Sequence, residues 1–166
     1  MYGLPAWGGC IAQNKKRIIN IQKRAIRTIT KSYFSAHTEP RMKQLGLLKF
    51  EDLYTQQCLL LTHDCYYKRA PKKIQSLCCN PHISNYSLRG QGQNPLDLKT
   101  SNFRSRAASN SYRANGPVLW NKHPDDLRMI QQKHLFKNKT KQHLLNKYEH
   151  KSSCTNPRCR DKSHHK

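Results

Sequence analysis

Residues 13–33, QNKKRIINIQKRAIRTITKSY, decide the fold class. Within them, aliphatic side chains recur at steps of three and four residues, at Ile18, Ile21, Ala25 and Ile29. This spacing is typical of one face of an amphipathic helix. The stretch therefore predicts a helix whose apolar face covers a small core in a mainly α protein.

The same helix carries a large excess of positive charge. Seven cations and no acid fall within it: Lys15, Lys16, Arg17, Lys23, Arg24, Arg27 and Lys31. Over the whole chain, 31 Lys and Arg outnumber 9 Asp and Glu, giving a formal net charge of +22 on 166 residues. Such an imbalance indicates a polyanionic partner, most often RNA or DNA. A merely solvated helix face is the alternative, and we favour phosphate contacts because no acid balances the cations.

Composition limits the size of the core and the class of protein. Apolar residues make up 36% of the chain and the mean hydropathy is −0.93, so one domain, or a small domain with tails, is expected. The longest aliphatic run, Leu59–Leu61, is far short of the roughly 20 residues of a membrane span. Without a basic region ahead of an apolar one, we expect no export signal and an intracellular location, nuclear or cytoplasmic.

The cysteines favour a reducing compartment. They are seven in number, an odd count, and form no CxxC pair, which is typical of free thiols. Cys58 and Cys65 recur on one helical face, and we expect them to be core thiols.

Breakers and charges divide the chain into four regions. A helical region over 1–77 begins with YGLPAWGG, which predicts a turn or packed cap, and includes a short helix that Gly46 ends and a longer helix from Phe50 to about Arg69. The other regions are a loop-rich linker over 78–117, an apolar segment with a basic helix over 118–148, and a basic Cys/His tail over 149–166. We expect short strands near Phe103 and Tyr112, and disorder in the tail and in part of the second half.

A second basic helix is predicted from about residue 131 to 148. Its sparse apolar side comprises Leu135, Phe136, Leu144 and Leu145. Further candidate phosphate contacts are Lys137, Lys139 and Lys141 on this helix and Arg113 in the linker.

No constellation predicts catalysis. Asp125 and Asp126 are adjacent carboxylates, as a two-metal polymerase site needs, but they follow a proline and precede a helical pattern. We therefore interpret them as acids in the first turn of a helix. No nucleophile motif surrounds any Cys or His. The chain is not expected to be an enzyme.

The tail contains the one candidate metal site. Cys154, Cys159 and His164 (or His165), with His150 as a fourth ligand, could surround a zinc ion. Four residues separate the two cysteines, where zinc sites usually have two, and basic tails often contain scattered Cys and His. Binding of no cofactor is therefore the alternative.

Aromatic residues lie among cations in three places: Tyr33 and Phe34 after Lys31, Tyr66 and Tyr67 before Lys68 and Arg69, and Tyr112 before Arg113. Such side chains can stack on unpaired bases. More often they are partly buried anchors, which is the interpretation we favour.

Several motifs occur together in a recognisable order. YGLPAWGG (2–9), KKRIINIQKRAIRTIT (15–30) and HTEPRMKQLGLLKFEDLYTQQ (37–57) resemble the segment that follows the polymerase core in non-LTR (LINE-type, jockey-like) retrotransposon reverse transcriptases. NSYRANGPVLWNKHPDDLR (110–128) is similar to a later motif of that family, with His123 where the family usually has Leu, and LLNKY (144–148) closes it. Residues 91–102 and the tail are not covered.

The resemblance implies a C-terminal thumb and post-thumb fragment of an RNA-directed DNA polymerase. The palm with its aspartate pair has no counterpart in this sequence, so the chain would help to hold the primer–template backbone without polymerising. The alternatives are a truncated relic without independent activity, with apolar surfaces shaped to pack on the missing palm, and a zinc-dependent nucleic-acid module using the tail. Nothing in the sequence indicates an oligomeric state.

Overall fold

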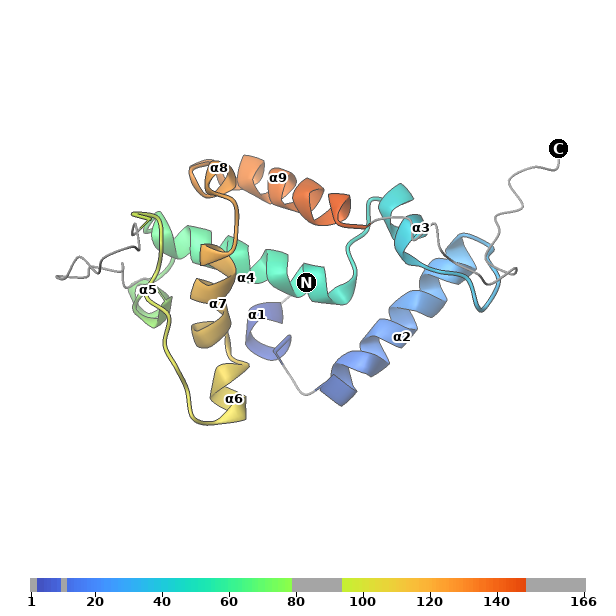
Figure 1. Cartoon of the computed structure of the whole chain (residues 1–166), viewed down its shortest axis with the longest axis horizontal. Coiled ribbons are helices and arrows are strands. Elements are labelled where there is room, and N and C mark those ends of the chain that lie inside the picture. The colour runs from blue at the N-terminus through green and yellow to red at the C-terminus, as the bar shows by residue number, and fades with distance from the viewer. Residues whose placement is uncertain (1–2, 10–11, 79–93, 149–166) are drawn as a thin grey trace. The chain divides into compact units, whose positions relative to one another are not determined.

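The protein is built from helices joined by turns and irregular segments (Figure 1). The computed structural model describes residues 3–9, 12–78 and 94–148, and within these ranges it contains no strand. The predicted mainly α fold class is confirmed. The helices are α1 (Leu4–Trp7), α2 (Ala12–Ile29), α3 (Glu39–Gln44), α4 (Phe50–Tyr66), α5 (Lys72–Cys78), α6 (Arg106–Ser109), α7 (Tyr112–Asn121), α8 (Asp125–Arg128) and α9 (Lys133–Asn146).

The chain forms two compact units. The described residues of unit 1 are 3–9, 54–78 and 94–140, and those of unit 2 are 12–53 and 141–148. Both units combine segments that are distant in sequence, so they do not correspond to the four consecutive regions predicted from the sequence. Helices α4 and α9 each contribute residues to both units.

An aromatic cluster forms the core of unit 1. Its buried members are Leu59, Leu60, Leu98, Trp120 and Phe136. The Trp120 indole N–H donates a 2.9 Å hydrogen bond to the carbonyl of Leu96. The Asn121 side chain accepts from the backbone N–H of Leu98 and donates to its carbonyl, both at 2.9 Å. The Trp-Asn pair therefore fastens the irregular segment around Leu98 to α7.

Helix α7 corrects the sequence interpretation. The prediction of short strands near Phe103 and Tyr112 was wrong, because Phe103 lies in an irregular segment and Tyr112 is the first residue of α7. Tyr112, Gly116 and Trp120 recur every four residues and are buried, which is helical spacing. The Gly-Pro pair inside this run is typical of a turn, and for that reason the helical spacing was not recognised in the sequence. The predicted linker over 78–117 thus includes α6 and the first half of α7.

Close packing of α7 on α4 requires a glycine. A Cβ at Gly116 would lie 2.8 Å from the Tyr112 ring and 3.1 Å from Thr62 Oγ1. Thr62 and the Tyr112 hydroxyl are also 3.1 Å apart and hydrogen-bonded. Cys58 and Cys65 are buried free thiols beside Tyr112, which confirms the prediction that they are core residues.

The short N-terminal helix α1 also belongs to unit 1. Leu4 is fully buried. Behind it, a Cβ at Gly8 would overlap the Tyr54 ring, and one at Gly9 would overlap the carbonyl of Asn110. The expected packed cap is therefore present, and its two glycines allow backbone to approach where a side chain would not fit.

Unit 2 has a smaller core. Its cluster of buried hydrophobic residues comprises Ile26, Met42, Leu48, Leu144 and Tyr148. Gly46 follows α3 with φ of 61°, which confirms the predicted helix end because glycine adopts this conformation without steric cost. Within α9, Phe136 and Leu144 are buried as expected, whereas Leu135 is exposed.

The inward face of α2 differs from the predicted one. Ile26 is 3% exposed and carries the core contact, while Ile21 is 67% and Ile29 62% exposed. Gln22 explains the difference, because its side chain donates to the carbonyl of Leu48 at 2.8 Å and accepts from the N–H of Phe50 at 2.9 Å. A polar residue thus belongs to the inner face and caps the start of α4, so hydrophobic spacing alone selected the wrong side.

Candidate nucleic-acid interface

The cations of α2 form two rows on the helix. Lys16 and Lys23 lie seven residues apart on one row, and Arg17 and Arg24 lie seven apart on the next, which corresponds to about 10 Å of helix rise. All four are exposed. Because α2 contains no acid, nothing on the helix itself neutralises these rows.

The remaining predicted contacts on α2 and after it have varied surroundings. Lys15 and Arg27 are partly buried, and the Arg27 Nε–H donates a 3.1 Å hydrogen bond to the carbonyl of Ala36. Lys31 is exposed and follows the end of α2 with φ of 47°. The helix therefore ends four residues before the predicted end at Tyr33.

The other predicted contacts are divided between the units. Lys141 is partly buried in unit 2. Lys137 and Lys139 on α9 and Arg113 on α7 are exposed residues of unit 1, and Arg113 lies over the Phe103 ring at 5.7 Å. The predicted residues thus do not form one site within a single unit, and α2 holds the largest group.

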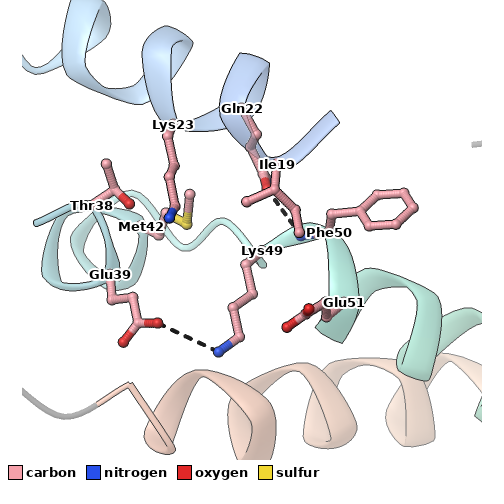
Figure 2. A pocket seen from close by; sticks show the side chains of 9 residues that line it. All are labelled: Ile19, Gln22, Lys23, Thr38, Glu39, Met42, Lys49, Phe50 and Glu51. Atoms are coloured by element: carbon pink, nitrogen blue, oxygen red, sulfur yellow. Dashed lines mark hydrogen bonds and ion pairs between the residues drawn. The ribbon is translucent and has the colours of Figure 1, made fainter. Parts of the chain in front are cut away.

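A cavity of about 220 Å³ lies in unit 2 beside α2, α3 and the start of α4 (Figure 2). Sequence reasoning did not find it, because its lining comes from three separate segments. The lining residues are Ile19, Gln22, Lys23, Thr38, Glu39, Met42, Lys49, Phe50 and Glu51.

Carboxylates make this cavity a poor site for an anion. Figure 2 shows the Lys49 side chain directed toward Glu39, with 3.6 Å between Nζ and Oε1. Asp52 Oδ2 lies 3.8 Å from the same ammonium group. Glu51 adds a further carboxylate to the lining. A phosphate would have to displace these groups, so the α2 surface is the better candidate for polyanion binding.

Tyr148 joins the two ends of unit 2 beside this cavity. Its hydroxyl accepts a 2.8 Å hydrogen bond from the backbone N–H of Lys49 and donates a 2.6 Å bond to Asp52. The Lys49 ammonium lies 5.1 Å from the centre of the tyrosine ring. Burial, reinforced by Asp52, raises the pKa of Tyr148. Almost one hundred residues separate these partners, so no local pattern signalled the contact.

Asp125 and Asp126 occupy the first turn of α8, as predicted. Asp125 accepts hydrogen bonds from Arg128 and from the Asn94 amide, the latter at 2.7 Å. Arg128 is 2% exposed and also donates a 2.7 Å bond to Asp97. Hydrogen bonding to Arg128 lowers the pKa of Asp125. Asp125 and Asp97 therefore neutralise a buried arginine in unit 1.

The predicted zinc ligands Cys154, Cys159, His164 and His150 lie outside the described residues. Within residues 3–9, 12–78 and 94–148, no three His, Cys, Asp or Glu side chains are placed to hold a metal ion together. In that part of the chain, no helix combines the length and apolar character of a membrane span. The zinc hypothesis stays a prediction.

Comparisons with protein-family models, curated proteins and solved structures found no match to this chain.

Proposed function

We propose that this chain binds RNA or DNA through the phosphate backbone, without catalysing a reaction on it. The supporting observation is the exposed double row of cations on α2, a helix with no acid. In both units, acids with ion pairs lie on other elements: Asp64 pairs with Lys133, Asp97 and Asp125 with Arg128, and Glu39 and Asp52 with Lys49. Lys16, Arg17 and Arg24 take part in none of these ion pairs, so their charge is available to a polyanion, whereas Lys23 also lines the cavity that contains Glu39 and Glu51.

The origin of such a surface follows from the sequence resemblance. We propose that the chain is the thumb and post-thumb region of a non-LTR reverse transcriptase, holding the primer–template backbone beside a polymerase site in a longer protein. The order and spacing of the motifs over most of the chain support this proposal, and several motif residues have distinct packing roles in the structure. Gly8, Gly9 and Gly116 permit close contacts, Trp120 and Asn121 fasten the segment around Leu98, and Tyr148 caps α4.

Salt dependence tests the binding proposal. Affinity for a short duplex should fall steeply with rising salt, as expected when cations displace counterions from phosphates. The triple variant Lys16→Gln, Arg17→Gln and Arg24→Gln should flatten the dependence of log K on log salt by about one unit for each phosphate interaction removed. A unit 1 triple variant, Lys73→Gln, Lys99→Gln and Lys122→Gln, has the same net charge. Equal weakening in both variants, or a flat dependence in the wild type, would contradict the proposal.

A second candidate function rests on a different observation. Ile21 and Ile29 are largely exposed on α2, eight residues apart, and exposed apolar side chains are expected on a helix shaped to pack on another domain. Under this alternative, the chain is a relic whose α2 fitted a polymerase palm, and it has no activity by itself. The wild type should then self-associate in sedimentation experiments and the variant with both isoleucines replaced by lysine should not, while nucleic-acid binding would be absent in wild type and variant alike.

A further inference from the structure

Backbone hydrogen bonds close the turn after α2. Ser32 donates from its N–H to the carbonyl of Arg27 at 2.9 Å, and Ala36 donates to the carbonyl of Tyr33 at 3.0 Å. Ala36 is buried, and its own carbonyl accepts the 3.1 Å hydrogen bond from Arg27. The residues between Ser32 and Ala36 are thus held in place at both ends of the turn.

This turn presents two aromatic side chains to solvent. Tyr33 is 60% and Phe34 is 79% exposed, the latter the highest value for a large apolar side chain in the described residues. The expectation that this pair would be partly buried anchors was therefore wrong. Ala36, two residues beyond Phe34, fills the buried position instead. A turn that is closed by backbone hydrogen bonds and exposes two rings offers them to a flat partner.

One cation lies over a ring of this pair, and another is close to the pair in sequence. The guanidinium carbon of Arg27 lies 5.6 Å from the centre of the Phe34 ring, and the exposed Lys31 precedes the pair. No Asp or Glu occurs from residue 12 to residue 38. The rings are consequently placed where a negatively charged chain would already be concentrated by α2.

We propose that Phe34 and Tyr33 form a stacking platform for unpaired bases, with Arg27 and Lys31 contacting the adjacent phosphates. This inference rests on the proposed nucleic-acid function and specifies its substrate as single-stranded RNA or DNA, or the unpaired end of a duplex. Bases within a duplex already stack on each other and offer only their edges. An unpaired base has a free face, and stacking on an aromatic side chain is tolerant of sequence.

The test uses the full chain and two probes, a labelled oligothymidine of about 12 nucleotides, within the usual span of single-strand sites, and a blunt-ended duplex of similar charge that has no unpaired base. Phe34→Ala should weaken binding to the single strand about tenfold, and Tyr33→Ala by a smaller factor. Phe34→Trp should retain binding, and Phe34→Leu should not, because leucine keeps the apolar area and loses the ring. Binding to the duplex should change less than about twofold in all four. Both residues are exposed, so circular dichroism spectra should match the wild type.

Different results separate this inference from the general function. If wild type binds both probes with steep salt dependence and Phe34→Ala changes neither, the stacking platform is wrong and phosphate binding remains. The stacking platform is also wrong if Phe34→Ala weakens binding to both probes equally, or if Phe34→Leu binds the single strand as well as wild type does. Failure of wild type to bind either probe overturns both proposals. Vesicles of anionic lipid serve as a third probe. If Phe34→Ala binds these vesicles more weakly than wild type but binds the single strand equally well, the rings belong to a membrane-binding surface instead.

Discussion

Unit 1 and unit 2 differ in where they place aromatic and charged side chains. Unit 1 encloses Trp120 and Phe136 and buries a charged side chain, Arg128, between carboxylates. Unit 2 has a mostly aliphatic core and sends both cations and aromatic rings outward from α2 and the turn behind it. We therefore expect the largest losses of stability from substitutions in the unit 1 core, whereas the proposed binding surface lies on unit 2.

The largest expected effect is in the core of unit 1. Trp120→Ala should reduce the free energy of unfolding by about 3–5 kcal/mol, since it leaves a large cavity and removes the hydrogen-bond donor to the carbonyl of Leu96. Urea denaturation followed by circular dichroism measures the decrease. Trp7→Ala is the matched control, because Trp7 is 45% exposed. Similar decreases for both tryptophans would contradict the assignment of Trp120 as the main core residue.

The inward face of α2 can be checked by a pair of substitutions. Ile26→Ala should cost about 2–3 kcal/mol of unfolding free energy, because a buried aliphatic group is removed. Ile21→Ala should change it by less than about 0.5 kcal/mol, as is usual for surface positions. Chemical denaturation of both variants decides the matter. The reverse order would restore the face that hydrophobic spacing predicted.

The ion pairs of the buried Arg128 predict that the stability of unit 1 falls at acidic pH. Asp97→Ala should cost about 2 kcal/mol, because Arg128 loses a charged hydrogen-bond partner. The pKa of Asp125 is lowered by Arg128, so its stabilising contribution is present above the unfolded carboxyl pKa of about 4 and is lost as the pH falls through the folded value. Thermal unfolding from pH 6 to pH 2 should show this decline. Asp125→Asn should reduce it, and an unchanged profile would argue against the pair.

The smallest effect concerns Tyr148 in unit 2. Tyr148→Phe removes the hydroxyl between Lys49 and Asp52 and should cost about 1 kcal/mol. The folded pKa of Tyr148 is raised, so wild type should keep this contribution below the unfolded tyrosine pKa of about 10 and lose it as the pH rises further. Urea midpoints at pH 8 and pH 10.5 measure the difference. The variant should show a shallower alkaline decline than wild type.

Local patterns predicted the helices better than their orientations. The helix from Phe50, the end of α3 at Gly46 and the first-turn position of Asp125 depend on nearby residues, and each was predicted. The inner face of α2 depends on Gln22, whose partners lie 26 and 28 residues away. Polar side chains that bond across such distances leave no periodic signal, so the predicted apolar face was the outer one.

The candidate site was predicted in part for the same reason. Runs of lysine and arginine are visible in any sequence, and α2 does expose most of its predicted cations. Exposure of Tyr33 and Phe34 was not predictable, because it depends on Ala36 being buried in their place. The Tyr148 cluster required the fold, since Lys49 and Asp52 are almost a hundred residues away.

The glycines that allow close packing have an evolutionary consequence. A lysine on α2 can be exchanged for arginine, or replaced by a neighbouring cation, with little change in the field around the helix. Gly8, Gly9 and Gly116 have no such freedom, because even one methyl group would overlap a neighbour. Among diverging copies of this sequence, we therefore expect the basic positions to drift and the glycines to persist. Ancestry would be traced by residues that touch no ligand.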